Sequence, residues 1–386
     1  MKKAGTVCSV LCMSVLAFVG GCGTRKEEQE PKGGEIGKIY AEGTVKSGEM
    51  ETGEDGKAHQ NTQFPEICQG GSKTGKVTFE CTLEVSETVR ENGLQTLRVE
   101  GVRPYDREKV YSYFAEGKEV AETFETPADK NQNAGYYYNF TDGASLGLDT
   151  NLSWGSEASS FYSLIGAANS ENQHYFAEDS VSFMSQEECV EKVKTILEEV
   201  GYPTEDLSFS AYPLSAASMN TLQEDEMEAG LLEPEKKNEL TEEDEAYFVY
   251  AYQEQEEIPI FHELMSVARL FAFDTPDNGP IRAIYSARGL EQLNIDYVYQ
   301  FANEQEPVQL QPFEDIRSVV EEKYENMLND SMYKVTRAKL FRRVYTDEKQ
   351  SYAEEPIWYF EVTDTGAGTN EVMLVNAETG KEINLP

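Results

Sequence analysis

The sequence predicts an α+β fold in which antiparallel sheets are each covered by a helix, with two tandem helix-plus-sheet units after a β-rich N-terminal unit. Apolar and polar residues alternate over residues 77–85, which is the period of a half-buried strand. Farther along, two helical apolar stripes, at 185–201 and 312–324, are each followed by three strand candidates. A sheet with one face under a helix is a compact way to bury such stripes.

The β-rich unit is expected to span residues 64–180. Residues 94–102 are a second strand candidate, and Asp106 is suited to cap a short helix that runs to about residue 115. Turns of Asp-Gly and Thr-Asn separate three further strand candidates, which lie at 136–140, 145–149 and 151–155.

The first helix-plus-sheet unit is expected over residues 181–300. Ser185 and Glu188 form a capping box, and Gly201 ends the apolar stripe. An acidic insertion at 223–245, poor in apolar side chains, is expected to form a mobile surface loop or an exposed helix. The strand candidates of this unit lie at 207–214, 246–253 and 281–286.

The second unit, residues 301–386, repeats this order. Its helix starts near Pro312 and carries apolar residues at 313, 316, 319, 320 and 324. Its strand candidates lie at 335–345, 357–363 and 371–376.

The N-terminus has the pattern of a lipoprotein signal peptide, residues 1–21. Lys2 and Lys3 precede an uncharged, mostly apolar run, which ends in Val-Gly-Gly before Cys22. The run resembles a lipobox, which predicts cleavage before Cys22 and lipidation of its thiol, and two acyl chains anchor durably. Residues 22–63 are rich in Gly, Glu, Lys and Thr and are expected to form a flexible linker. An uncleaved signal anchor is the alternative.

Charge excludes some partners. Without Lys2 and Lys3 the chain has 31 basic residues against 71 acidic ones, a formal charge near −40. Nucleic acid and anionic lipid surfaces would repel such a chain. Because the acidic residues are spread along its whole length, a solvated acidic surface explains them better than one acidic binding face.

Three cysteines remain in the expected mature chain besides Cys22. Cys68 and Cys81 are close enough in sequence for a disulfide that closes a small loop, and the residues alone leave this pairing open. Cys189, near the start of a predicted helix, is interpreted as a small buried apolar residue.

The C-terminal hundred residues resemble the PepSY-type and YycH/YycI-like extracytoplasmic domains of Gram-positive bacteria. The matching features are the helix, the Pro-Ile-Trp-Tyr-Phe strand at 356–360 and the closing turn at 375–381, where Asn376 replaces the usual Asp. The whole chain also resembles an uncharacterised lipoprotein family of gut Firmicutes. The resemblance implies regulation of a neighbouring protein, such as a peptidase or a sensor kinase, through protein contact. It implies no catalytic residues.

Metal and catalytic sites are not expected. His262 begins His-Glu-Leu-Met-Ser, which lacks the second histidine of a zinc protease motif, and His59 lies in the expected linker. A nucleophilic triad would need His174 or His262, but no Gly-x-Ser-x-Gly elbow is expected, and both histidines are interpreted as ordinary residues. Residues 129–140 open like a calcium loop, but Ala134 and Phe140 replace the required Gly and Glu. We therefore expect no catalytic residues, no metal and no cofactor.

The candidate ligand-facing aromatic residues are Tyr136, Tyr137, Tyr138 and Trp154. Consecutive tyrosines of a strand point to opposite faces, so one side belongs to the core and the other is open to a ligand.

We expect a noncatalytic lipoprotein, lipid-anchored at the extracytoplasmic face of the cell membrane, that binds or regulates another envelope protein. One alternative is a ligand-binding lipoprotein for sugar or peptide, which predicts an aromatic-lined pocket. The other is a hydrolase, which predicts two carboxylates in a cleft with opposed pKa shifts.

Overall fold

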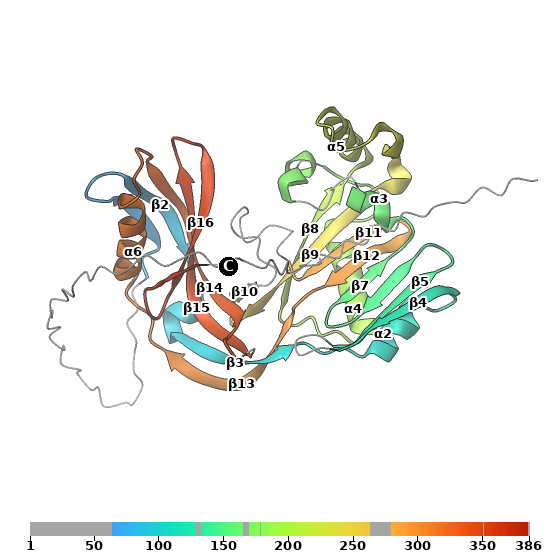
Figure 1. Ribbon diagram of the computed structural model, residues 1–386, viewed down its shortest axis with the longest axis horizontal. Helices are drawn as coiled ribbons and strands as arrows, with labels where there is room; N and C mark the ends of the chain where they lie inside the picture. The colour runs from blue at the N-terminus through green and yellow to red at the C-terminus, as the bar shows by residue number, and fades with distance from the viewer. Residues whose placement is uncertain are drawn as a thin grey trace, which may run out of the picture. The chain divides into compact units, whose positions relative to one another are not determined.

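The computed structural model describes residues 64–128, 133–164, 170–177, 179–262, 279–349 and 351–384. Within these ranges, fifteen strands form one hydrogen-bonded network and two more form a separate ribbon. The predicted fold class is confirmed. The chain is α+β, and two units of a helix followed by three antiparallel strands come after a β-rich N-terminal part (Figure 1).

The central sheet has the strand order β8-β9-β11-β12-β7-β6-β5-β4, and all of these pairs are antiparallel. Strands β8, β9 and β11 are those predicted for the first helix-plus-sheet unit. The pairing of β7 with β12 continues the same sheet into the N-terminal strands. The strands are β4 (Val120–Thr126), β5 (Gly135–Phe140), β6 (Ser145–Leu148), β7 (Leu152–Gly155), β8 (Leu207–Leu214), β9 (Ala246–Gln255), β11 (Ile281–Ser286) and β12 (Gly289–Ile295).

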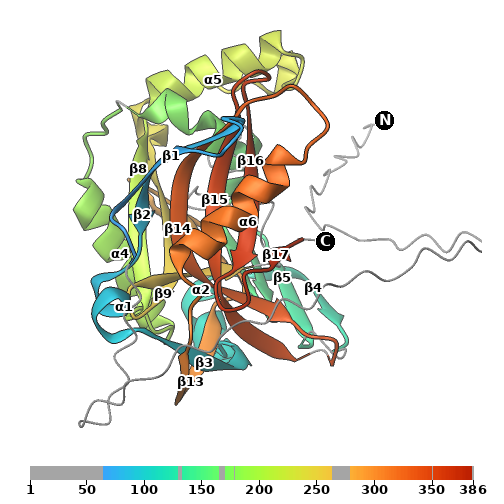
Figure 2. The ribbon, with the colours of Figure 1, turned by 90° about the vertical axis from the view of Figure 1, so that its left-hand side faces the viewer.

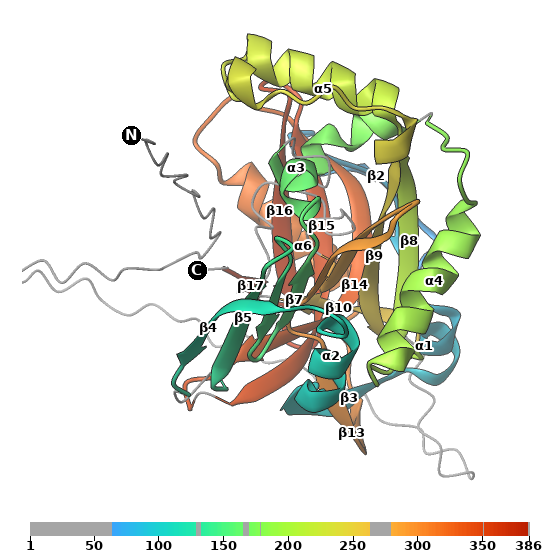
Figure 3. The same ribbon diagram turned by 90° about the vertical axis from the view of Figure 1, so that its right-hand side faces the viewer.

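Two helices cover one face of the central sheet, here called the helix-covered face (Figure 3). Helix α4 (Gln186–Glu199) begins with the predicted capping box, because Ser185 and Glu188 exchange side-chain to backbone hydrogen bonds. Helix α2 (Arg107–Phe114) is capped by Asp106. The core beneath them includes Val110, Phe114, Leu146, Leu148, Trp154, Cys189, Val193, Leu197, Val249, Ala283 and Leu293.

Part of the opposite face, over β8, β9 and β11, packs against α3 (Ser159–Leu164), η1 (Ser170–Phe176) and α5 (Ala216–Glu228). The acidic insertion begins within α5 and continues through η2 (Pro234–Lys236) and η3 (Glu242–Asp244). Gln223 is fully buried and exchanges two hydrogen bonds with the backbone of Asn238. The insertion is therefore held to the body at its base, while Leu231 is 80% exposed.

The C-terminal sheet has the order β1-β2-β14-β15-β16-β17, with β2 and β14 parallel and the other pairs antiparallel. Helix α6 (Phe313–Glu325) lies across one face (Figure 2) and buries Phe313, Ile316, Val320 and Tyr324. The predicted alternation of β2 is confirmed, since Val77, Phe79, Cys81 and Leu83 are buried. The strands are β1 (Ile67–Gly71), β2 (Val77–Glu84), β14 (Tyr333–Thr346), β15 (Tyr352–Asp364), β16 (Thr369–Asn376) and β17 (Glu382–Ile383).

Two connections link these sheets. Strand β10 (Ile258–His262) forms a hairpin with β9 and then pairs in parallel with β14. A ribbon pairs β3 (Leu94–Val102) with β13 (Tyr299–Val308). Helix α1 (Glu87–Asn92), capped by Ser86, lies between β2 and β3 in sequence. None of the helices in the described ranges combines the length and the apolar character needed to cross a bilayer.

Candidate functional site on the central sheet

The four candidate aromatic residues do not form one surface. Trp154 is only 7% exposed and stacks on Phe114 of α2 with ring centroids 4.8 Å apart. Tyr136 and Tyr138 pack against the same core cluster. Trp154 therefore belongs to the core, which corrects the expectation that it faces a ligand. Helices α2 and α4 cover this side of the sheet and bury the side chains that point toward it. Tyr137 is the candidate that points to the opposite face.

Tyr137 lies on the half-exposed face, stacked on Phe124 of β4. The two rings have centroids 4.7 Å apart and an interplanar angle of 11°. The Tyr137 hydroxyl donates to Asp149 Oδ2 at 2.7 Å, which fixes the direction of the side chain. Burial, and then this bond to a carboxylate, raise the pKa of Tyr137. The phenol therefore stays neutral and keeps its proton for Asp149.

Two glycines make room for this ring. A Cβ at Gly147 would lie 3.2 Å from ring atom Cδ1 of Tyr137, and a Cβ at Gly135 would lie 2.8 Å from Cε2. A side chain at Gly135 would force the Thr126 hydroxyl and the Tyr137 ring to move, and one at Gly147 would force the Ser153 hydroxyl to move and crowd the ring. We call Phe124, Tyr137, Gly135 and Gly147 the Tyr137 platform. It is a stacked pair of aromatic rings with a fixed orientation.

Polar side chains continue the surface across the sheet. Tyr137 is paired with Gly147, Gly147 with Ser153, and Ser153 with Asn294. Directly paired residues of antiparallel strands point to the same face. Ser153 is exposed and Asn294 is half-buried. The platform is thus followed by a hydroxyl and an amide, groups that both donate and accept hydrogen bonds.

A small cavity of about 290 Å³ adjoins Asp149 and is lined by Arg103, Tyr105 and Arg107 among others. Its basic groups already have partners. Arg107 Nη2 donates to the Asp149 carbonyl at 3.0 Å, and Arg103 pairs with Asp206. The cavity lies at the lower end of the volumes of ligand pockets, and its arginines are engaged within the protein, unlike the aromatic-lined pocket expected of a ligand-binding lipoprotein.

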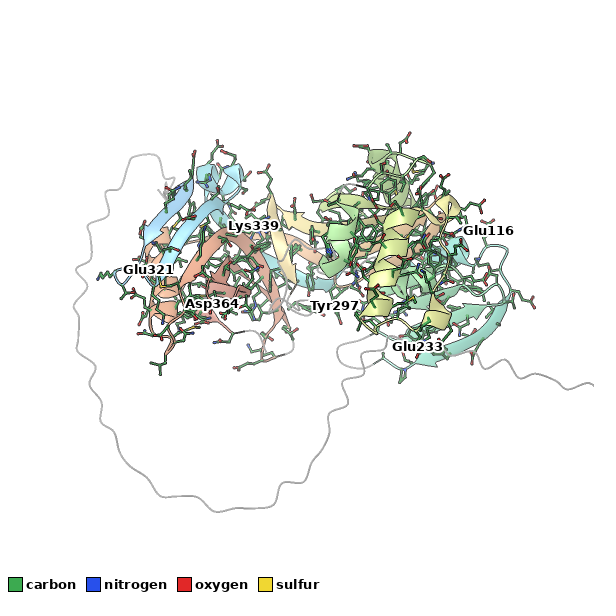
Figure 4. The ribbon with its side chains drawn as sticks, turned by 90° about the horizontal axis from the view of Figure 1, so that it is seen from above. Glu116, Glu233, Tyr297, Glu321, Lys339 and Asp364 are labelled. Atoms are coloured by element: carbon green, nitrogen blue, oxygen red, sulfur yellow. The ribbon has the colours of Figure 1, made fainter. Side chains whose placement is uncertain are left out.

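The platform lies beside a free sheet edge. Strand β4 pairs only with β5 in the described part of the chain, and all of its residues are exposed except Phe124, which is half-buried. Such an edge presents unpaired backbone N–H and C=O groups. The segment 116–126 carries four exposed glutamates and one lysine, and Glu116 is labelled in Figure 4.

Groups that resemble catalytic machinery have structural partners instead. Glu291 is 4% exposed, and both of its oxygens accept hydrogen bonds, from Ser156, Ser286 and Arg288. Burial alone would raise the pKa of Glu291, but these bonds together hold it below its usual range. These three hydrogen bonds hold the Glu291 carboxylate in place between β12 and the neighbouring turns.

One stretch of the sequence does match the motif of a catalytic serine, contrary to expectation. Residues 143–147 read Gly-Ala-Ser-Leu-Gly, which matches the Gly-x-Ser-x-Gly pattern of hydrolase nucleophile elbows. An elbow places its serine on a sharp strand-to-helix turn. Here the residues form the turn after β5 and the start of β6, and Ser145 is an exposed strand residue. The pattern therefore marks a hairpin.

The other candidates are dispersed. His174 is exposed in η1 and His262 ends β10. Within the described ranges, no three His, Cys, Asp or Glu side chains come together as metal ligands would. Cys22, His59 and most of the calcium-like segment, residues 129–132, lie outside the described residues.

No family model matches the chain, and no curated protein does. Among solved structures, an uncharacterised protein from Eubacterium rectale is similar, with a TM-score of 0.56 and 13% identity over 83% of this chain and 94% of that one. The YpeB C-terminal domain of Bacillus megaterium aligns over 78% of this chain and 97% of that one, at 12% identity and a TM-score of 0.32. The first likeness shows a shared fold; the second score is too low to establish one.

Proposed function

We propose that this protein is a membrane-anchored extracytoplasmic lipoprotein that performs no catalysis and binds or regulates another protein of the cell envelope. The sequence before Cys22 supports the anchor, because a basic start, an apolar run and two small residues precede the thiol. A Cys22→Ser variant is expected to lose the lipid mass and the membrane association. A variant that keeps both would contradict the anchor.

The free edge of β4 beside the Tyr137 platform is the observation that carries the binding role. An exposed edge can accept an extended segment of a partner as an added strand, and a neighbouring side-chain surface then supplies specificity. Phe124 and Tyr137 offer aromatic area that is already fixed, so a partner orders little on binding.

The acidic charge beside β4 indicates which kind of segment binds there. The segment 116–126 is acidic on an acidic chain, so a neutral or acidic segment gains nothing from approaching it. We therefore commit to an extended, basic segment of an envelope protein. Its main chain pairs with β4 and one of its apolar or basic side chains contacts the stacked pair of Phe124 and Tyr137.

Crosslinking and pull-down with the full lipidated protein in native membranes test this proposal. The wild type and a Tyr113→Ala control, which removes an exposed tyrosine of α2, are expected to capture the same partner. A Phe124→Ala/Tyr137→Ala variant is expected to lose it while keeping the wild-type circular dichroism spectrum. Equal capture by the double variant would exclude this surface. Recovery of lipid and the protein alone would contradict the regulatory role.

A ligand-binding role is the second candidate, because aromatic rings followed by the polar side chains of Ser153 and Asn294 also suit a sugar, which has both apolar faces and hydroxyl groups. Titration with neutral oligosaccharides separates the two. A saturable change in tyrosine fluorescence that Tyr137→Ala abolishes would favour the sugar, and its absence favours the protein partner.

A further inference from the structure

Cys68 and Cys81 face each other across the first hairpin of the folded body. They are direct Cα partners in the pairing of β1 with β2. Both side chains are buried, at 4% and 6% exposure, and they belong to the core cluster that α6 covers. The sequence left the pairing of these cysteines open, and they are free thiols in this structure.

The hydrogen bonds of the hairpin fix the spacing of this pair. The Leu83 N–H donates to Glu66 O at 2.9 Å, and the Ser72 N–H donates to Val77 O at 2.8 Å. Hydrogen-bonded pairs recur at every second position, so both bonds place Cys68 and Cys81 in a hydrogen-bonded pair. In such a pair the Cα atoms lie about 5.5 Å apart. Disulfides have their commonest Cα separation at about 5.5–6 Å.

The two thiols are also prepared for different steps. The hydrogen bond from Cys81 lowers the pKa of Cys68, while burial raises it and the Arg317 guanidinium lowers it. The same bond and burial raise the pKa of Cys81. Arg317 forms an ion pair with Glu321, the residue labelled in Figure 4, with Nε and Oε1 2.9 Å apart. Arg317 Nη1 also donates to Gln69 O at 3.4 Å. Cys68 is therefore the thiol that ionises first and attacks.

We propose that Cys68 and Cys81 form a disulfide that clasps β1 to β2. The proposal rests on the proposed extracytoplasmic placement, because disulfides persist in oxidising compartments. The oxidant is a disulfide, either of a thiol oxidoreductase or of a small molecule. The Cys68 thiolate attacks one of its sulfurs and releases a thiolate. The Cys81 thiol loses its proton and attacks the Cys68 sulfur, which expels the second thiolate. Two protein thiols are oxidised and the oxidant is reduced to two thiols.

The proposed disulfide lies where the linker enters the folded body. Strand β1 is the first strand of the described chain, and it pairs with β2 alone. Residues 22–63, the proposed linker, precede it, so tension on the anchor acts on β1 first. A covalent bond passes that tension to β2, which is paired with β14 as well.

Peptide mapping of the full exported protein tests the clasp. The protein is denatured without reductant, alkylated with N-ethylmaleimide and digested. We expect one linked peptide pair containing Cys68 and Cys81, no adduct on either, and an adduct on Cys189, the fully buried internal control. A Cys68→Ser variant is expected to expose Cys81 to alkylation, whereas Cys189→Ser keeps the link. Adducts on both Cys68 and Cys81 of the wild type would overturn the proposal.

The same digest separates this inference from the anchor. The lipid mass on the Cys22 peptide reports anchoring independently of the linked pair. A linked pair without lipid supports the clasp and contradicts the anchor, and lipid without a linked pair does the reverse. Refolding the reduced protein with oxidised glutathione is a second test, in which failure to form the link also counts against it.

Discussion

Arg342 of β14 offers the sharpest test of how the parts of this chain are joined. Its side chain is fully buried, and so, at 1% exposure, is that of its partner Glu354 on β15. Arg342 Nη1 donates to Glu354 Oε1 at 3.2 Å and to Gln95 O of β3 at 2.6 Å, and Nη2 donates to Glu256 Oε2 at 2.7 Å. One guanidinium thus joins β14 and β15 to β3 and to the β9–β10 turn.

Replacing Arg342 by methionine leaves Glu354 buried, with a hydrogen bond from the Leu97 N–H to its Oε2 in place of an ion pair. Breaking a buried pair from one side costs about 3–5 kcal/mol, because the other charge stays in the interior without compensation. Glu256 contributes little to this cost, since its side chain is 32% exposed and water can solvate it. We expect Arg342→Met to lower the free energy of unfolding by about 3–5 kcal/mol at neutral pH.

The pH dependence follows from Glu354. Burial, opposed by Arg342, holds the pKa of this carboxyl above its usual range. The folded state therefore binds the proton more tightly than the unfolded state, and stability falls as pH rises from the usual carboxyl range to the folded-state pKa. Loss of Arg342 raises this pKa further and widens that window. The penalty of Arg342→Met is expected to shrink as pH falls toward about 4.

Urea unfolding at pH 7.5 and at pH 5.0 measures both effects. The Arg342→Met/Glu354→Leu double variant, which removes both charges, is expected to recover most of the loss, to within about 2 kcal/mol of the wild type, with no pH dependence from this site. A single variant within about 1 kcal/mol of the wild type at pH 7.5 would refute this reasoning. So would a double variant less stable than the single one.

Three further predictions concern the central sheet and its turn. Trp154→Ala is expected to cost about 3–5 kcal/mol in urea unfolding as a core cavity, whereas Tyr137→Ala, on the half-exposed face, should cost less than half as much. Gly147→Ala puts a Cβ 3.2 Å from Tyr137 Cδ1 and 2.5 Å from Ser153 Oγ, so it is expected to shift the ring and the hydroxyl and to weaken partner capture; unchanged capture would argue against the platform. Glu257 has φ of 63°, so Glu257→Gly is expected to stabilise the chain by about 1 kcal/mol, and a lower urea midpoint would contradict this.

The sequence predicts those elements whose signals are local. Alternation identifies β2, the capping box identifies the start of α4, and β8, β11 and β3 occur at the predicted residues. Strand β4 escapes prediction because Val-Ala-Glu-Thr-Phe-Glu-Thr does not alternate, since an exposed edge strand has no buried face to enforce it. Strands β10, β12 and β13 were likewise not predicted.

For the candidate site, the sequence cannot predict which face of strand β5 is buried. Alternation alone tells us that Tyr137 opposes Tyr136 and Tyr138, but not which side is core. That choice depends on α2 and α4, which bury one face of the sheet through contacts distant in sequence. Trp154 was misplaced for the same reason. The pairing of β7 with β12 is equally invisible in the sequence, because it joins residues more than a hundred positions apart.

The free edges of the network argue for β4 as the partner strand. Strand β17 has two residues, β8 contains Pro213 and lies beside η1, and β1 ends in two glycines. Only β4 among these described edges combines seven exposed or half-exposed residues with a fixed aromatic surface. Its glutamates protect the edge against a second copy of this acidic chain, as charges on edge strands do. Under the proposed function the same charges still admit a basic strand, so protection from self-association and selection of the proposed partner would have one electrostatic cause.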